Sequence, residues 1–363
     1  MKKKTIFVTK PSLPLLKDLI PYLEKIWENK ILSNNGPFHR QLEDALCNYL
    51  GVPYISLVSN GTIGLIIALK ALDIKGEVIT TPYSYVATAH SLKWSKIKPI
   101  FVDIDPSTLN LDPEKIESAI TPNTTAIMPV HVYGNPCDVD AIETIAKKNN
   151  LKVIYDAAHA FGVKCHCGSI LNHGNLSVLS FHATKVFNTF EGGAIISQDK
   201  KTKDHIDQIK NFGFTGETIV EQIGINGKMS EFNAALGLLQ LKQIDNVVRK
   251  REEIDQVYRK GLKNIPGIKC LTYTNLEKGN YSYFPIFVDD DYPLSRDQLY
   301  NKLKENNING RRYFYPLITK HKMYENKTDF MHAKKASNQV ICLPIYSNLK
   351  RENIKLIIDT IKF

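Results

Sequence analysis

Two ionisable residues in the middle of the chain lie at or just after the ends of apolar, β-rich runs. Asp156 ends the run 153–156, and Lys185 lies three residues after the run 178–182. An aspartate that ends a buried strand is costly unless it meets a cation, such as a protonated pyridine nitrogen, or several donors. A lysine at such a sheet edge forms a Schiff base once its pKa is lowered. Two ordinary interpretations stay open: Asp156 as the cap of a following helix, and Lys185 as a solvated lysine.

Two earlier segments could contact a flat, phosphorylated ligand. Ser59-Asn60-Gly61-Thr62 follows a strand and opens a helix, whose free N–H groups suit a phosphate. Tyr85 follows another strand, where its ring could stack on a planar cofactor. The alternatives are a plain capped turn and an aromatic residue of the core. The glycine fingerprints of nucleotide-binding loops are absent, which disfavours a nicotinamide oxidoreductase.

The four features occur in chain order, each directly after a predicted strand. In open α/β sheets, ligands bind at the carboxyl ends of the strands. A phosphate-binding turn, a stacking ring, an acid for a ring nitrogen and a lysine are the parts that pyridoxal 5′-phosphate (PLP) requires. The combination therefore predicts a PLP site, which none of the segments predicts alone.

The elements that must position these residues alternate between strands and helices from about residue 38 to residue 200. This alternation predicts a mainly parallel sheet with helices on both faces. Only about 11 residues separate the last two strands, whereas a parallel crossover needs a dozen or more. The last strand is therefore predicted to be antiparallel, which gives a mixed seven-stranded sheet. The predicted strands are Ile55–Val58, Val78–Thr81, Ile100–Ile104, Ala126–Val132, Val153–Asp156, Val178–His182 and Ala194–Ser197.

The pattern changes in the C-terminal third. Ser230 to about Lys263 is predicted to be one long helical stretch, apolar in its first half and highly charged in its second. We expect it to join an N-terminal arm and large PLP-binding domain, residues 1–245, to a smaller C-terminal α/β domain, residues 246–363. The smaller domain is expected to contain a strand at Tyr283–Val288, a helix at Ser295–Asn306 and a final helix from Arg351.

Composition narrows the class of protein. The 363 residues are 43% hydrophobic and 23% charged, as in ordinary globular proteins. No stretch approaches the roughly 18 apolar residues of a membrane helix, and the apolar run near the N-terminus is too short for a signal peptide. The net charge of +10 is spread out, without a nucleic-acid-binding motif. We expect a cytoplasmic protein that binds neither membranes nor nucleic acid.

The six cysteines form no paired framework, which suits a reducing compartment. Cys165-His166-Cys167 is the one tight cluster. A zinc site takes about four ligands, and no second half is visible in the sequence. We therefore expect no metal here and interpret the segment as a loop beside Gly168.

The sequence resembles the DegT/DnrJ/EryC1/StrS family of sugar aminotransferases, which have fold type I among PLP enzymes. The resemblance covers nearly the whole chain. Its segments are Leu32-Ser-Asn-Asn-Gly36-Pro, Val102-Asp-Ile-Asp-Pro106, Pro129-Val-His-Val-Tyr-Gly134, Asp156-Ala-Ala, Ser180-Phe-His-Ala-Thr-Lys185, Glu191-Gly-Gly and Gly224-Ile-Asn-Gly-Lys-Met229. It implies transfer of an amino group from L-glutamate to a nucleotide-linked keto-sugar. Within the family the chain is most similar to enzymes that act on dTDP-4-keto-6-deoxy-D-glucose, for surface polysaccharide (O-antigen) synthesis.

The resemblance also implies roles for individual residues. Lys185 matches the lysine that carries the cofactor, and Asp156 matches the partner of the pyridine nitrogen. Tyr85 matches the stacking aromatic. Asn226 matches an asparagine that reaches the phosphate from a second subunit, which implies a homodimer with shared active sites. The remaining phosphate contacts are expected from Gly61, Thr62 and Ser180.

The chain departs from the family pattern at two positions. His159 stands where members commonly have Gln; it is expected to bond the 3′-oxygen of the cofactor, and its protonation would then tune the cofactor. Lys228 stands where many have Arg, so a bidentate contact is lost. Substrate contacts are expected among loop residues that are equally interpretable as solvated or packing residues: Asn35, Lys228, Arg311, Tyr313 and Tyr315. Two rival functions stay open, a 3-keto-sugar aminotransferase and a non-catalytic PLP-binding regulatory protein.

Overall fold

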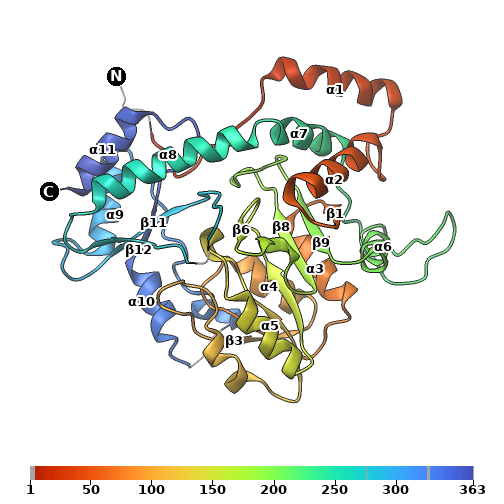
Figure 1. Cartoon of the computed structure of the whole chain (residues 1–363), viewed down its shortest axis with the longest axis horizontal. Helices are drawn as coiled ribbons and strands as arrows, with labels where there is room; N and C mark the ends of the chain where they lie inside the picture. The colour runs from red at the N-terminus through yellow and green to blue at the C-terminus, as the bar shows by residue number, and fades with distance from the viewer. Residues whose placement is uncertain (1–4, 275, 325–327, 363) are drawn as a thin grey trace.

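A seven-stranded sheet forms the centre of the molecule, and a three-stranded sheet lies toward the C-terminal end (Figure 1). The computed structural model describes residues 5–274, 276–324 and 328–362. The larger sheet contains, in spatial order, β1 (Tyr54–Val58), β9 (Gly193–Ser197), β8 (Leu176–Ser180), β5 (Lys152–Asp156), β4 (Thr124–Met128), β2 (Glu77–Thr80) and β3 (Lys98–Phe101).

The direction of the strands agrees with the sequence. β9 is antiparallel to β1 and β8, and the other paired strands of this larger sheet are parallel. Residues 181–192, which connect β8 to β9, contain no helix to carry the chain back across the sheet. The mixed seven-stranded sheet is therefore confirmed. The predicted strand 126–132 ends earlier, at Met128, because Pro129 has no N–H to donate to the ladder.

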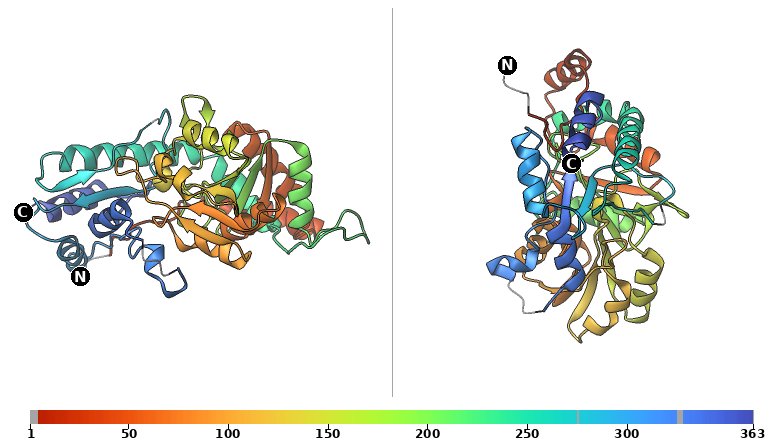
Figure 2. Two further views of the ribbon diagram at one scale, coloured as in Figure 1. Left: turned by 90° about the horizontal axis from the view of Figure 1, so that it is seen from below. Right: turned by 90° about the vertical axis from the view of Figure 1, so that its left-hand side faces the viewer.

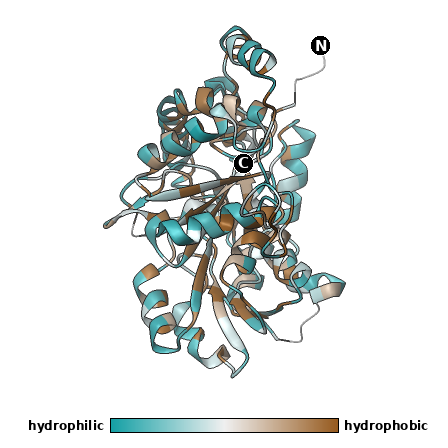
Figure 3. Cartoon of the chain, turned by 90° about the vertical axis from the view of Figure 1, so that its right-hand side faces the viewer, coloured by the Kyte–Doolittle hydropathy of each residue, from teal (hydrophilic) through white to brown (hydrophobic). Residues whose placement is uncertain are grey.

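Helices cover both faces of this sheet because successive strand residues point to opposite sides. In β5, Val153 and Tyr155 enter one core and Ile154 enters the other. Hydrophobic residues are concentrated along the central strands (Figure 3). One core includes α2 (Pro37–Leu50), α5 (Val139–Lys148) and α7 (Glu231–Leu241), and the other includes α3 (Gly61–Ala71), α4 (Val86–Trp94) and α6 (Lys200–Ile209).

The prediction of one continuous helix over 230–263 is wrong, because the stretch forms two helices. α7 ends at Leu241, and α8 (Ile244–Leu262) begins after a break at Lys242 and Gln243. At the break the Gln243 N–H bonds the Gln240 carbonyl three residues back, while the Gln240 side chain donates to the Ser12 carbonyl at 2.5 Å. The local turn thus replaces helical hydrogen bonds, and α8 continues toward the C-terminal sheet (Figure 1).

The C-terminal elements enclose a core of their own. It is built around residues such as Tyr258, Phe284 and Ile357, and Ile6 near the N-terminus joins it. Figure 2 shows these elements at one end of an elongated molecule. The separate core supports a division at 245/246, which remains a prediction. The elements are β10 (Ile268–Cys270), β11 (Phe284–Val288), β12 (Val340–Leu343), α9 (Arg296–Glu305), α10 (Met331–Gln339) and α11 (Arg351–Ile361).

Shorter elements complete the chain. They are α1 (Leu16–Asn29), the hairpin of β6 (Lys164–Cys165) and β7 (Gly168–Ser169), and the 3-10 helices η1 (Pro113–Lys115), η2 (Glu117–Ala119), η3 (Val132–Gly134), η4 (Ile170–Asn172), η5 (Ile318–Lys320) and η6 (Lys322–Tyr324). Among the described residues, none of the helices is both long and apolar enough to cross a bilayer.

Candidate active site

A cavity of about 640 Å³ opens where the strands of the large sheet end, a size typical of small-molecule sites. Both parts of the chain line it. The large-sheet part contributes Asn60, Gly61, Thr62, Ser84, Tyr85, Asp156, His159, Ser180 and Lys185, and the C-terminal part contributes Tyr283, Arg311, Tyr313 and Phe314. The four sequence segments that predicted a cofactor site therefore converge on one cavity.

Asp156 is only 5% exposed at the carboxyl end of β5. Its Oδ2 accepts a hydrogen bond from Thr88 Oγ1 at 2.7 Å, and its Oδ1 accepts one from the Ala158 N–H at 3.2 Å. Burial raises the pKa of the carboxyl, and these donors oppose the shift. Residues 157–163 form turns rather than a helix, so Asp156 is not a helix cap. The carboxylate keeps acceptor capacity for a cationic group in the cavity.

Lys185 follows β8, the strand that pairs with β5, so its amine enters the cavity near Asp156. Its Nζ donates to Tyr283 Oη at 3.5 Å and lies 6.0 Å from the centroid of that ring. Burial lowers the pKa of the amine to about 8, although the Asp156 carboxylate raises it. A larger share of Lys185 than of an ordinary lysine is therefore the neutral, nucleophilic amine.

The turn at Gly61 brings a helix N-terminus against the end of β8. A Cβ at Gly61 would lie 2.9 Å from the Ser180 Cβ, so a larger residue would push the two segments apart. Asn60 caps α3, with its Oδ1 accepting from the Ile63 N–H at 2.9 Å. The first-turn N–H groups of Gly61 and Thr62 have no acceptor within the helix. Together with the hydroxyl groups of Thr62 and Ser180, they suit a phosphate.

His159 is a neutral hydrogen-bond donor at the cavity wall. The Tyr133 N–H donates to its Nδ1 at 3.2 Å, which assigns the ring proton to Nε2, 3.4 Å from Tyr283 Oη. The ring lies parallel to Phe314, with centroids 6.1 Å apart. Burial, and then the charge of Lys185, lowers its pKa well below the usual value. The ring stays neutral at physiological pH, so the tuning by protonation that the sequence suggested is not expected.

Of the predicted substrate contacts, only Arg311 and Tyr313 line the cavity, with the guanidinium 5.1 Å from the Tyr313 ring. Asn35 is exposed, and its carbonyl accepts from Arg40 at 2.6 Å. Lys228 instead donates to Asn211 Oδ1 at 2.9 Å.

The remaining predicted substrate contact also lies outside this cavity. Tyr315 packs against Arg296 and Arg312, whose guanidinium carbons lie 4.4 and 5.0 Å from its ring centroid. Asn226, the residue predicted to reach the phosphate of a second subunit, is exposed and belongs to a bridge with Asn211.

Three residues that hold the site together were not predicted from the sequence: Thr88, Tyr283 and Phe314. Thr88 lies three residues after Tyr85, one turn into α4, so that spacing was a usable signal for a residue at the same edge. Tyr283 and Phe314 approach from the C-terminal part, more than 120 residues from Asp156 in the chain, and no local pattern marks them.

These residues fit a PLP molecule. The glycine turn suits its phosphate, the Asp156 carboxylate suits a protonated ring nitrogen, and the amine of Lys185 suits its aldehyde. His159 supplies a donor for a ring oxygen. The exposed ring of Tyr85, which lines the cavity, is available for stacking.

Comparison with known proteins agrees with this fit. Residues 15–362 match the DegT/DnrJ/EryC1/StrS aminotransferase family. The chain is 58% identical, over 99% of both chains, to the dTDP-4-amino-4,6-dideoxy-D-glucose transaminase of Shigella dysenteriae. It also superposes on DesI, solved in the presence of its TDP-sugar product, with a TM-score of 0.94 at 31% identity, covering 99% of this chain and 92% of the other. For NtdA from Bacillus subtilis, solved with bound cofactor PMP, the TM-score is 0.88 at 29% identity, with 99% and 86% covered.

The predicted fold class, fold type I of the PLP-dependent transferases, and the predicted PLP cofactor are thereby confirmed.

The lowered pKa of Lys185 gives a testable pH dependence in the cofactor-free chain. Competitive labelling with an amine-selective reagent, followed residue by residue with mass spectrometry, should show Lys185 becoming reactive with a midpoint near pH 8. Exposed lysines should follow about two pH units higher. Asp156→Asn should move the Lys185 midpoint downward, because the carboxylate raises this pKa. A midpoint equal to that of the exposed lysines would contradict the burial of the amine.

Proposed function

Because the chain belongs to the DegT/DnrJ/EryC1/StrS aminotransferase family, we propose that it transfers the amino group of L-glutamate to a nucleotide-linked keto-sugar. The proposed acceptor is dTDP-4-keto-6-deoxy-D-glucose, and the product is the amino sugar for which the Shigella dysenteriae relative is named. One observation carries the proposal: a lysine of lowered pKa and a buried aspartate share a cavity with a helix N-terminus.

The residues of the cavity have distinct roles in this reaction. Bound PLP supplies an electron sink for the carbon that loses its proton. Asp156 holds the proton on the ring nitrogen, and Thr88 fixes the position of its carboxylate. Lys185 binds the cofactor, and its freed amine moves the proton at the α-carbon of the amino donor. His159 donates a hydrogen bond to the ring oxygen.

Substrate recognition is proposed for Arg311 and Tyr313, the two predicted contacts that line the cavity. A guanidinium there suits the carboxylate of glutamate or the diphosphate of a nucleotide. Amination at the 3-position of a related sugar is the alternative within the same chemistry. A regulatory protein that only binds PLP is disfavoured, because both Lys185 and Asp156 are present.

We further propose that the enzyme works as a cytoplasmic homodimer in surface polysaccharide (O-antigen) synthesis. Two observations support shared active sites. Asn226 lies outside the cavity of its own chain and is exposed. Several aromatic residues near it in sequence are also exposed, including Phe212 at 47% and Phe232 at 38%.

Substitution of the lysine tests the reaction. Lys185→Ala should abolish both the absorbance of bound cofactor in the visible range and amino transfer, because no other amine replaces its Nζ. The exposed Lys70→Ala should leave both unchanged. Wild-type enzyme with glutamate and dTDP-4-keto-6-deoxy-D-glucose should give an amino sugar whose position is read by NMR. A 3-amino product would favour the alternative acceptor, and normal turnover by Lys185→Ala would refute the assignment.

Because His159 acts as a neutral hydrogen-bond donor, we predict that the side-chain amide of glutamine can replace its imidazole. His159→Gln should keep kcat/KM within a few-fold and leave its pH profile unchanged. His159→Leu should lose roughly 10–100-fold, the value of a hydrogen bond to a charged group. Steady-state rates over a range of pH measure both. A pH profile that loses a titration near neutrality in His159→Gln would show that the ring does become charged.

Mixed dimers test whether Asn226 serves the second subunit. In a dimer of one Lys185→Ala chain and one Asn226→Asp chain, the site with an intact lysine receives an intact asparagine from its partner. Refolding an equal mixture should restore about a quarter of wild-type activity, because half of the dimers then carry one intact site. If Asn226 acts within its own chain, the mixture should show no recovery above the sum of its parts.

A further inference from the structure

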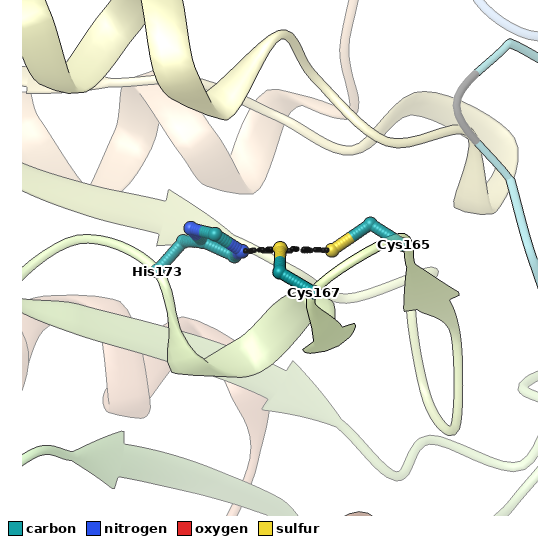
Figure 4. Close-up of side chains that lie close together, drawn as sticks. All are labelled: Cys165, Cys167 and His173. Carbon is teal, nitrogen blue, oxygen red and sulfur yellow. Dashed lines mark hydrogen bonds between the residues drawn. The ribbon is translucent and has the colours of Figure 1, made fainter.

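A second group of ligand-type side chains lies outside the cavity, in the connection between β5 and β8. Cys165 and Cys167 belong to the β6–β7 hairpin, and His173 follows η4 (Figure 4). The sulfur atoms are 3.0 Å apart. His173 Nε2 lies 3.1 Å from the Cys167 sulfur and 3.5 Å from that of Cys165. In the sequence the two cysteines form a tight cluster without His173, which becomes their neighbour only through the fold.

A carboxylate from another element orients the histidine. Glu143, on α5, places its Oε1 3.4 Å from His173 Nδ1. A proton on Nδ1 satisfies this contact and leaves the lone pair of Nε2 directed at the two sulfurs. Histidines that bind metals usually donate their other ring N–H to such a carboxylate. This contact is independent of the hairpin and points to the same ligand.

We propose that Cys165, Cys167 and His173 bind one Zn²⁺ ion, with a water molecule in the fourth position. Two thiolates and one imidazole are the sulfur and nitrogen ligands that zinc prefers. Each thiol releases its proton when its sulfur coordinates the ion. His166 is not a ligand, because its exposed ring is turned to Asp140, with Nε2 4.0 Å from Oδ2.

The present distances are close to those of a tetrahedral zinc site. Zn–S bonds of about 2.3 Å and a Zn–N bond of about 2.0 Å place two sulfurs roughly 3.7 Å apart and a sulfur and a nitrogen roughly 3.5 Å apart. The sulfurs must therefore separate by less than an ångström. Cys167 can make this movement because it is exposed at the hairpin, whereas Cys165 is buried.

Hydrogen bonds connect the hairpin that carries the cluster to a wall of the cavity. The Lys164 carbonyl accepts from the N–H groups of Glu277 and Lys278, which ties the hairpin to the segment that leads to Tyr283. Asn280 in that segment donates to the His159 carbonyl at 2.8 Å. An ion at the hairpin would thus stabilise a wall of the cavity without touching it.

Metal content of the full-length holoenzyme tests the proposal. The reduced protein is stripped of metal with a chelator, loaded with Zn²⁺ and freed of unbound metal. Its zinc content per chain is then measured by inductively coupled plasma mass spectrometry. Wild type, His166→Ala and Cys47→Ser should retain one ion per chain, while Cys167→Ser and His173→Ala should not. Glu143→Gln should weaken binding about 10–100-fold. Co²⁺ should give tetrahedral absorption bands in the red, where the cofactor does not absorb.

Circular dichroism and cofactor absorbance show whether a variant that binds no zinc has lost only a ligand or has failed to fold. Zn²⁺ should raise the Tm of wild type and of His166→Ala but not that of His173→Ala. The proposal is overturned by wild type that retains no zinc, by His173→Ala that binds it as tightly as wild type, or by a Cys165–Cys167 disulfide that persists in reductant. Turnover of His173→Ala should remain within a few-fold of wild type, because the cluster does not contact the substrate.

Discussion

The active site depends on keeping an amine and a carboxylate away from water in one cavity. Each ion loses hydration there, and the cost for buried ions is several kcal/mol. The pKa shifts record this cost: Lys185 is displaced toward the neutral amine and Asp156 toward the neutral acid, while each charge opposes the shift of the other. A cofactor with a cationic ring nitrogen and an aldehyde satisfies both groups at once. The same burial that costs stability therefore makes the lysine reactive.

The reversed strand is what brings the phosphate turn to these groups. Because β9 runs antiparallel between β1 and β8, it starts at the edge where those strands end. Gly193 begins β9, and a Cβ there would lie 2.9 Å from the backbone of Asn60 and Gly61. Gly61 in turn leaves no room beside Ser180. Small residues at both positions allow three chain segments to meet at the spot where a phosphate is expected.

The C-terminal part closes the cavity rather than forming a separate site. Tyr283 contacts both Lys185 and His159, and Phe314 packs on the His159 ring. A hydrophobic cluster that includes Tyr83 and Phe314 joins the two parts. The hairpin that carries Cys165 and Cys167 is hydrogen-bonded to the segment before Tyr283. Two distant regions thus converge on the position of one tyrosine.

The sequence by itself determined the alternation of strands and helices around the large sheet, the reversal of its last strand and the meeting of Lys185, Asp156 and the Gly61 turn at one sheet edge. These follow from local periodicity, connection length and the chemistry of residues at strand ends. The break between α7 and α8, the closing residues Tyr283 and Phe314, the neutral state of His159 and the approach of His173 to the two cysteines were decided only by tertiary structure. Each of these features depends on burial or on contacts between residues distant in the chain. A local pattern of residue types contains no information about burial or about such contacts.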